Sequence, residues 1–269
     1  MKFDFAGLGT NLVSDAMWSV VFFALAMAYN RMYDYFRYDQ RYRRVWGLPR
    51  GEQTVEVSVA RLKHTFSRVT SLSDIRAVSA ISESLIQGYG AKRVKLHIAQ
   101  IGTANSESRA IGANAADREK VSHPRVIVAV GGPRYNGISE RALAEAKTRF
   151  HFERVPRKDD AGNVVKDDAG KPEEMYVLHD GESPLPEGQY AVLYRLANPF
   201  NKEPGSAVFV LAGLHAEGVT AAGRALVDES MRSLAKTVKG LGPYWEVLFR
   251  VHAETETVEP DPVSASVRP

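Results

Sequence analysis

The stretch VIVAVGGPRYNG, residues 126–137, decides the fold. Its first five residues are all apolar and mostly β-branched, which is typical of a strand that helices bury on both faces. Gly131 and Gly132 follow at once, where they let the backbone turn sharply and leave it open to a ligand. Ligands of open α/β sheets bind at the carboxyl ends of such strands. The stretch therefore predicts a buried strand that ends either at a ligand site or in an ordinary strand-to-helix turn.

The composition excludes several classes of function. The 269 residues are 44% hydrophobic and 25% charged, as in a globular protein with one main core. The formal net charge is only +3, so no global field directs the chain to nucleic acid, and no nucleic-acid partner is expected. The sequence contains no cysteine, which excludes disulfides, thiolate zinc sites and a cysteine nucleophile.

An apolar run near the N-terminus predicts a membrane anchor. Residues 16–30, AMWSVVFFALAMAYN, carry no charge, proline or glycine, and the arginine- and aromatic-rich residues 31–51 follow them. This order is typical of a cytoplasmic membrane boundary, which places the N-terminus outside and the remainder in the cytoplasm. We therefore expect a single pass through the inner (cytoplasmic) membrane, with membrane lipid as a partner. The alternatives are an interfacial helix, a partner-binding helix and a core helix.

The same apolar run predicts self-association. Its small residues Ser19, Ala24, Ala26 and Ala28 allow two helices to approach closely within a bilayer. A homo-oligomer is therefore the expected assembly. Whether the helices would line a pore is left open by the sequence.

Composition and periodicity divide the chain into three regions. Residues 1–50 form the anchor with its basic and aromatic flank, residues 51–254 a cytosolic ligand-binding domain, and residues 255–269 a tail that is expected to be disordered. Strands alternate with helices in the central region, which predicts an α/β sandwich with a mainly parallel sheet. The repeated KDDAG within residues 158–171 predicts an exposed antiparallel insertion. One long amphipathic helix is expected over residues 219–239.

Three strand ends carry residues suited to a ligand. They are GGPRYN at residues 131–136, NPFN at 198–201 and AGLHAEGVT at 212–220. If the three strands are parallel neighbours, these ends lie along one edge of the sheet, where helix N-termini favour an anionic or nucleotide-like ligand. The candidate ligand-binding residues are Gly131, Gly132, Arg134, Asn136, Asn198, Gly213, His215 and Thr220, with Asp74 and Arg76 from the start of an earlier helix. The alternative for these last two is a helix cap and a surface charge.

The signatures of common enzymes are missing from the sequence. It contains no GxSxG elbow, no HExxH pair, no GxxxxGK[ST] loop and no GxGxxG fingerprint. Glu217 and His215 are the candidate acid–base pair, but adjacent positions on a loop need not converge. We therefore assign no catalytic residue, metal ligand or cofactor. Whether the chain is an enzyme stays open, and the balance favours a binding protein.

Four short motifs carry a resemblance to a known group of proteins. DIRA at residues 74–77, GGPRYN, NPF and the AGLH strand end resemble those of a diffuse group of bacterial Rossmann-like sensor domains, over about residues 55–253. The chain departs from the group's pattern at Val219, which separates Gly218 from Thr220. A Rossmann-like domain behind a membrane helix is also similar to the effectors of nucleotide-signalled antiphage systems.

The resemblance implies a membrane-anchored cytosolic sensor of a nucleotide-like or other anionic ligand, acting as an oligomeric defence effector. It also implies a Rossmann-like form of the predicted sandwich. Two alternatives come from other classes of protein: a nucleotide or nucleoside hydrolase that uses the same cleft, and a scaffold that docks a partner protein at the membrane.

Overall fold

The computed structural model of the 269-residue chain describes residues 17–29, 32, 41, 44–48, 53–60, 71–91, 94–101, 124–186, 188–252 and 257–266. The chain divides into two compact units, Met1–Arg41 and Tyr42–Pro269. The second unit contains a seven-stranded sheet and a separate three-stranded sheet.

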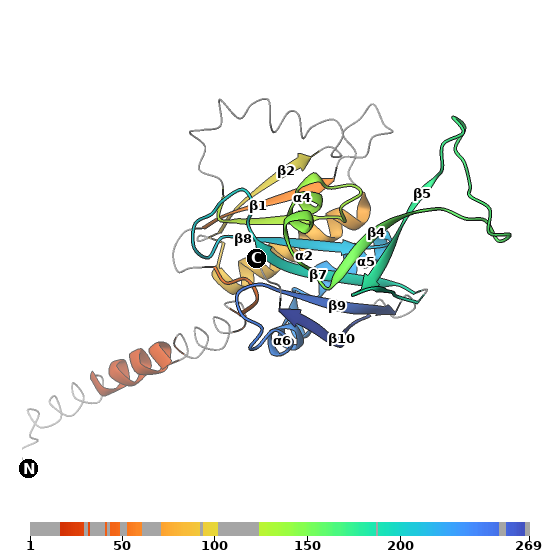
Figure 1. The fold of residues 1–269 in the computed structure, drawn as a ribbon. Coiled ribbons are helices and arrows are strands. Elements are labelled where there is room, and N and C mark those ends of the chain that lie inside the picture. Colours follow the sequence, from red (N-terminus) through yellow and green to blue (C-terminus); the bar gives the residue numbers. More distant parts are fainter. Residues whose placement is uncertain are drawn as a thin grey trace, which may run out of the picture. The chain divides into compact units, whose positions relative to one another are not determined.

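The large sheet combines parallel and antiparallel strands (Figure 1). Its members are β1 (Gln53–Ala60), β2 (Val94–Ile101), β3 (Val126–Val130), β7 (Tyr190–Ala197), β8 (Ala207–Gly213), β9 (Trp245–His252) and β10 (Thr257–Ser266), in the order β10-β9-β7-β8-β3-β1-β2. Strands β2, β1, β3 and β8 run parallel, whereas β7 is antiparallel to both β8 and β9. Five of the seven strands therefore share one direction. The predicted α/β fold with a mainly parallel sheet is confirmed.

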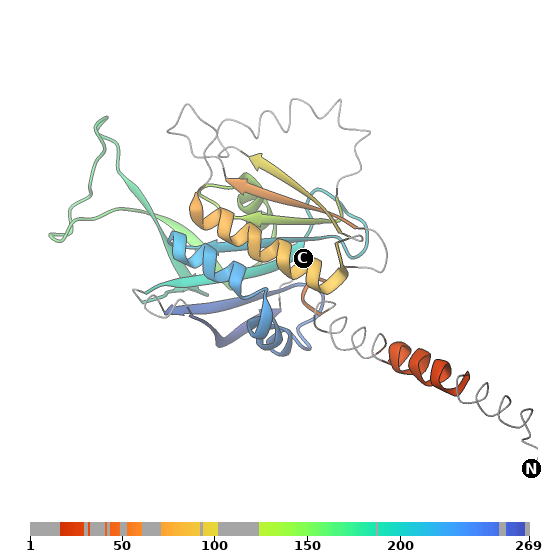
Figure 2. The ribbon, with the colours of Figure 1, turned by 180° about the vertical axis from the view of Figure 1, so that it is seen from behind.

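Helices cover both faces of the large sheet (Figures 1 and 2). The helices α2 (Leu72–Tyr89), α5 (Ala216–Arg224) and α6 (Asp228–Thr237) lie on one face, and α4 (Gly137–Glu145) lies on the other. Successive residues of β3 point to opposite faces, so Val128 joins the core beneath α2 and α5, while Ile127 and Ala129 join the core beneath α4. Burial on both faces explains why β3 is apolar throughout.

Two helices occupy the region where one long helix is expected. Helix α5 ends at Arg224 and α6 begins at Asp228, with the buried Ala225 and Leu226 in the turn between them. Helix α5 packs on β7 and β8, whereas α6 packs on β10 at the end of the strand order. A single straight helix over residues 219–239 could not follow the sheet to both places, so the prediction is wrong.

The small sheet forms the predicted antiparallel insertion between α4 and β7. It consists of β4 (Phe150–Pro156), β5 (Glu174–Asp180) and β6 (Ser183–Pro184). Beyond β4 and β5 the chain continues into an exposed arm with two tight turns (Figure 1). The carboxylate of Asp159 accepts hydrogen bonds from the backbone N–H of Ala161 and Asn163, and Asp167 repeats this arrangement in the second turn. The repeated aspartates are therefore turn residues.

The tail expected to be disordered contains a strand. Strand β10 pairs antiparallel with β9, and its register shifts between Pro260 and Ser264. Proline cannot donate to a strand ladder, but at the end of a strand order or at a bulge it need not do so. The lack of periodicity in residues 257–266 therefore indicates an irregular edge strand, and the prediction of disorder is wrong for these residues.

The boundary of the α/β unit lies before residue 45. Val45, Trp46 and Leu48 are at most 3% exposed. The Trp46 ring lies 4.7 Å from the ring of Phe209, and its Nε1 donates a hydrogen bond to Ser84 Oγ at 3.2 Å. Trp46 is therefore part of the core of the α/β unit. Its assignment to the aromatic flank of a membrane anchor, residues 1–50, is wrong.

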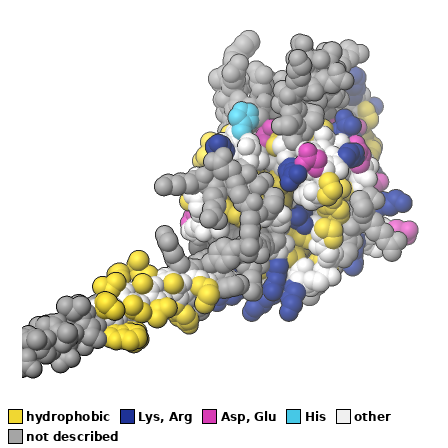
Figure 3. Space-filling model, turned by 90° about the vertical axis from the view of Figure 1, so that its left-hand side faces the viewer, with side chains coloured by type: hydrophobic (Ala, Val, Ile, Leu, Met, Phe, Trp, Pro, Cys, Tyr) yellow, Lys and Arg dark blue, Asp and Glu magenta, His cyan; other side chains and the backbone are white. Residues whose placement is uncertain are grey.

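The first unit contains a helix whose apolar side chains are exposed. Residues 17–29 are helical, and their large apolar side chains are between 42% and 68% exposed (Figure 3). No helix among the described residues is both long and apolar enough to cross a bilayer. The predicted membrane segment, residues 16–30, reaches one residue beyond this helix on each side, to Ala16 and Asn30, which lie outside the described residues.

A buried carboxyl group ties the insertion to the large sheet. Glu246 of β9 is 1% exposed, and its two carboxyl oxygens accept hydrogen bonds from the backbone N–H of Arg149 at 2.7 Å and of Phe150 at 3.0 Å. Burial raises the pKa of Glu246 from its ordinary 4.5 to about 7, and these two hydrogen bonds act in the opposite direction. The proton of Glu246 is therefore held more tightly in the folded chain than in the unfolded chain.

Glu246→Gln is expected to flatten the pH dependence of stability between pH 4.5 and 7. A raised carboxyl pKa stabilises the fold fully below pH 4.5, and this contribution is lost as the pH rises to about 7. The difference amounts to roughly 3 kcal/mol over that range. Urea denaturation from pH 4.5 to 7.5 measures the free energy of unfolding of both proteins. Equal pH slopes would contradict the prediction, since other titrating groups act on both proteins alike.

Candidate functional site

A cavity of about 450 Å³, here called the central pocket, opens at the carboxyl ends of β3 and β8. The glycines that end these strands form its floor, and the first turns of α2 and α5 form its walls. Its lining residues are Ser71, Ser73, Asp74, Gly131, Gly132, Tyr135, Gly213, Leu214, His215, Ala216, Glu217 and Val219. The position matches the place where open α/β sheets bind ligands.

The glycines of the central pocket have different physical roles. Gly131 has a φ of 102°, which side chains rarely adopt, so it makes the turn after β3. Gly132 has no such φ, and a Cβ added to it would find its nearest neighbours, in Ala212 and Gly213, only at 3.9 Å. A Cβ on Gly213 would lie 2.7 Å from the Cα of Gly218, so Gly213 allows α5 to rest on the strand end. A Cβ at Gly132 would therefore make only ordinary van der Waals contacts, whereas one at Gly213 would clash.

Two helix N-termini meet at the central pocket. Helix α2 is capped by Ser71, whose Oγ accepts a hydrogen bond from the backbone N–H of Asp74 at 3.1 Å. Helix α5 has His215 at its N-cap, and the His215 side chain makes no capping hydrogen bond. The first N–H groups of α5 thus have no side-chain cap and carry the partial positive charge of a helix N-terminus. They are suited to donate hydrogen bonds to a ligand.

The charged groups of the central pocket are acidic. Asp74 is 5% exposed, and burial raises its pKa from 3.8 to about 6, against the opposing effect of its hydrogen bond with Ser71. Glu217 is the second carboxyl group, and no lysine or arginine is among the described residues that line the pocket. A compact anion would be repelled by these two carboxylates. A ligand with hydroxyl groups would donate hydrogen bonds to them instead.

A second cavity, here called the side pocket, adjoins the first. It measures about 670 Å³ and lies against the insertion sheet. The two cavities share Gly132, Tyr135, Gly213, Leu214 and His215. Arg134 lines the side pocket, with its guanidinium carbon 5.3 Å from the centre of the Tyr135 ring.

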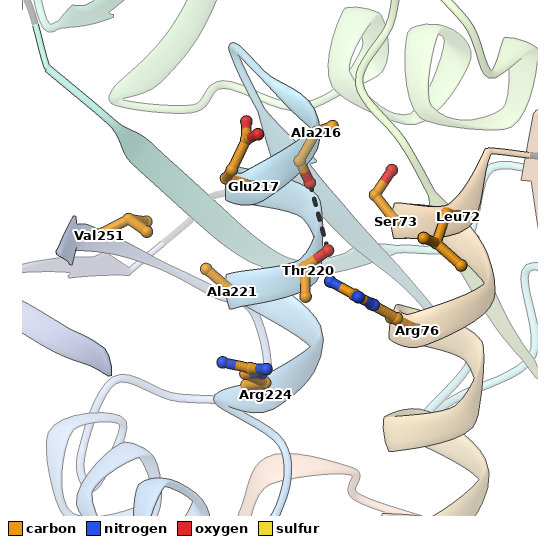
Figure 4. Close-up of a pocket in the computed structure, with 9 residues that line it drawn as sticks. All are labelled: Leu72, Ser73, Arg76, Ala216, Glu217, Thr220, Ala221, Arg224 and Val251. Carbon is orange, nitrogen blue, oxygen red and sulfur yellow. Dashed lines mark hydrogen bonds between the residues drawn. The ribbon is translucent and has the colours of Figure 1, made fainter. Parts of the chain in front are cut away.

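A smaller groove of about 260 Å³ runs between α2 and α5 (Figure 4). Arg76 extends from α2 toward Thr220 on α5. The hydroxyl of Thr220 donates a hydrogen bond to the backbone oxygen of Ala216 at 3.4 Å. This groove shares Ser73, Ala216 and Glu217 with the central pocket, so it extends the site along the two helices.

The structure brings most of the predicted site residues to one edge of the sheet. The central pocket contains Gly131, Gly132, Gly213, His215 and Asp74. Arg134 lines the side pocket, and Arg76 and Thr220 line the groove. Asn136 and Asn198 line none of the three. The grouping therefore holds for eight of the ten candidates.

Asn198 lies at the opposite edge of the sheet. It follows β7, which runs antiparallel to β8, so its carboxyl end points away from the central pocket. The Asn198 Nδ2 donates a hydrogen bond to the backbone oxygen of Pro124, just before β3, at 3.1 Å, and its Oδ1 accepts one from Phe200 N. The assumption of three parallel neighbours is wrong for β7, and Asn198 does not share an edge with the other candidates.

Asn136 is a structural residue rather than a pocket residue. It is completely buried, and its Oδ1 caps α4 by accepting hydrogen bonds from Ile138 N at 3.0 Å and Ser139 N at 3.4 Å. Its Nδ2 donates to the backbone oxygens of Val130 at 3.0 Å and Ser58 at 3.2 Å. One side chain thus joins β1, β3 and α4, and it has no polar atom left for a ligand.

Asn136→Ala is expected to lower the free energy of unfolding by about 2–3 kcal/mol, because it removes a helix cap and leaves buried carbonyl groups without a donor. Urea denaturation measures the loss. Asn163→Ala, in the exposed arm, is the matched control and should change stability by less than about 0.5 kcal/mol. Weaker ligand binding at unchanged stability would contradict the structural role and return Asn136 to the site.

The sequence reasoning missed the insertion as a wall of the site. Phe152, Met175 and Val177 line the side pocket, together with Leu185 and Gln189. The available signal was the position of the insertion, which follows directly on the helix that begins at the GGPRYN turn. A segment inserted at this edge of the large sheet is expected to lie next to the carboxyl ends of the strands, and so next to the site.

Comparison with protein-family models and with curated proteins found no match for this chain. The resemblance to Rossmann-like sensor domains and to antiphage effectors therefore stays a prediction.

Proposed function

We propose that the chain is a sensor that binds a nucleotide-like ligand in the central pocket. The observation that carries the proposal is the meeting of two helix N-termini, an open glycine backbone at Gly132 and the buried Asp74 in one cavity. Cavities of about 450 and 670 Å³ are in the size range of small-molecule sites. Their place at the carboxyl ends of β3 and β8 supports the same reading.

The charges favour a nucleotide over a simple anion. Sugar hydroxyls can donate hydrogen bonds to Asp74 and Glu217, while the backbone N–H groups of α5 donate to ligand oxygens. The arginines lie outside the central pocket, Arg134 in the side pocket and Arg76 and Arg224 in the groove. In this arrangement the sugar occupies the central pocket and the phosphate reaches into the groove toward Arg76. The proposed ligand is therefore a nucleotide with a sugar and a phosphate, and not a simple anion.

Titration calorimetry of the full-length chain in detergent tests the proposal. Adenosine monophosphate and ribose 5-phosphate are expected to bind, and inorganic phosphate is not. Asp74→Asn should weaken binding at least tenfold, because an amide presents one acceptor in place of two. Asp160→Asn, on the exposed arm, should leave binding unchanged. The proposal is overturned if neither the nucleotide nor the sugar phosphate binds.

A nucleotide or nucleoside hydrolase is the second candidate. The observation in its favour is the pKa of Asp74, which burial raises to about 6 and which suits a general acid near neutral pH. Incubation of the full-length chain with adenosine monophosphate, followed by chromatography for free adenine and phosphate, separates the candidates. Turnover that disappears in Asp74→Asn would establish the enzyme, whereas the sensor leaves the nucleotide intact.

The proposal includes a single-pass membrane anchor and a cytoplasmic α/β unit that assembles into oligomers, as the resemblance to antiphage effectors implies. Its support is the helix of residues 17–29, whose apolar side chains are exposed. The alternative function, a scaffold that docks a partner protein, does not account for the pockets at the strand ends.

Full-length chain is expected to sediment with membranes, and removal of residues 1–41 should release it. The cut falls at the boundary of the α/β unit and keeps Trp46 in its core. A cut at Gly51 would remove Trp46, so that shorter chain should be less stable. Ultracentrifugation of cell lysates checks this. Monodisperse full-length protein in the supernatant without detergent would show that the proposed membrane anchor is wrong.

A further inference from the structure

We infer that the side pocket is the subsite for a planar heteroaromatic group of the ligand, with the insertion sheet as its wall. This inference rests on the proposed function, since the remainder of the same ligand occupies the central pocket. The side pocket measures about 670 Å³, larger than the cavity it adjoins. Its walls come from three parts of the chain: the GGPRYN turn, strands β4 to β6 with the residues that follow them, and the turn between β8 and α5.

The two pockets adjoin at the strand ends. Gly132 and Gly213 form the shared floor, and Tyr135 and His215 lie at the junction. A ligand held by the N-terminus of α5 therefore has a path from the central pocket to the side pocket over the Gly132 backbone. A group attached to a sugar in the central pocket can reach the insertion sheet by this path.

The insertion presents an apolar and aromatic surface to the side pocket. The contributing residues are Phe152, Met175, Tyr176, Val177, Leu178, Leu185 and Pro186. Tyr135 on the opposite side is 45% exposed and Met175 is 43% exposed. Aromatic and apolar side chains that flank a cavity provide stacking surfaces for a planar ring, independent of which base it is. A ring between these walls would cover both exposed side chains.

One polar atom selects the kind of ring. The Oε1 of Gln189, which lines the side pocket, is buried and has no hydrogen-bond partner among the described residues. A buried acceptor without a donor is costly, and if the Gln189 amide turns toward the cavity a ring with an N–H donor would satisfy it. No carboxylate is among the described residues that line the side pocket, so a positively charged ring gains no ion pair there. A neutral ring with an exocyclic amine, such as adenine, fits best.

The inference is tested by titration calorimetry of the full-length chain in detergent with adenine, ribose 5-phosphate, adenosine monophosphate and purine riboside monophosphate. Adenosine monophosphate should bind at least tenfold more tightly than ribose 5-phosphate, which lacks the base. It should also bind more tightly than purine riboside monophosphate, which has a hydrogen atom in place of the exocyclic amine and no ring N–H donor. Free adenine should bind weakly.

Two variants separate the subsites. Val177→Trp places a bulky side chain on the strand that lines the side pocket and should reduce the affinity for adenosine monophosphate to that for ribose 5-phosphate, leaving the latter unchanged. Gln189→Leu should abolish the preference for adenosine monophosphate over purine riboside monophosphate, and it decides the matter if Val177→Trp does not fold. Val164→Trp, at a position on the arm that is 41% exposed, is the matched control and should change no affinity.

The outcomes distinguish this inference from the proposed function. Equal affinities for adenosine monophosphate and ribose 5-phosphate, unchanged in both pocket variants, overturn the aromatic subsite and leave the central pocket in place. Adenine binding that Val177→Trp abolishes, with no binding of ribose 5-phosphate, supports the aromatic subsite and overturns the central pocket. Binding of none of the four compounds overturns both.

Discussion

Gly132→Val is expected to abolish nucleotide binding while the chain remains folded. Gly132 lines both pockets, so a branched side chain would fill the passage between them. Its φ lies outside the range that side chains avoid, and an added Cβ would meet its nearest neighbours only at 3.9 Å. We therefore expect at least a 100-fold loss of affinity for adenosine monophosphate, with a free energy of unfolding within about 1 kcal/mol of wild type.

Gly131→Val is the matched comparison at the neighbouring position. With a φ of 102°, Gly131 cannot accept a side chain without strain, which costs of order 1–3 kcal/mol. Calorimetry with adenosine monophosphate and urea denaturation, applied to both variants, should show lost binding at Gly132 and lost stability at Gly131. If Gly132→Val keeps its affinity, the ligand does not cross the strand ends and the proposed site is wrong.

The sequence predicted the strands and glycine turns of the site because their signals are local. An unbroken apolar run such as residues 126–130 indicates burial on two faces, and the glycines after β3 and β8 mark where the side chains stop. The first turn of α2 was also found, since Asp74 lies close to a predicted helix start. Each of these features is set by neighbours in the sequence.

The direction of β7 needed information that the apolar pattern does not contain. A strand reads the same in either direction, so NPFN after β7 looked like a further ligand-binding strand end. The connection from β7 to β8, residues 198–206, is nevertheless too short for a crossover between parallel strands, which takes a dozen residues or more. Loop length would have predicted the antiparallel pairing and removed Asn198 from the site.

The environments of Trp46 and of β10 were predicted wrongly because both depend on tertiary packing. Trp46 stands among aromatic and arginine residues that suit a membrane boundary, yet it packs on Phe209 and donates a hydrogen bond to Ser84. Strand β10 contains two prolines and gains its order from pairing with β9. The partners of Trp46 are distant in the sequence, and the prolines of β10 hide a strand whose partner β9 is close, so local patterns favoured the wrong environment.

Gly218→Ala is expected to cause the largest loss of stability, about 3–5 kcal/mol. A Cβ at Gly218 would lie 2.5 Å from the backbone oxygen of Tyr190 and 2.9 Å from the Cα of Gly213. Both atoms belong to the sheet backbone, which cannot shift without disturbing β7 and β8. Helix α5 would have to move away instead, exposing the buried Val219 and Ala222 that pack in the core.

Glu217→Ala, on the neighbouring exposed side chain, is the matched control for Gly218→Ala and should cost less than about 1 kcal/mol. Urea denaturation compares the two. The glycines of AGLHAEGVT could serve either to leave room for a ligand or to let α5 pack on the sheet. In the first case a methyl group facing the sheet would be tolerated, and in the second it would lower the stability. A Gly218→Ala chain as stable as wild type would show that α5 can rest elsewhere. The close contact between Gly213 and Gly218 indicates that this glycine pair allows the N-terminus of α5 to lie against the end of β8. Without that contact the central pocket would not form.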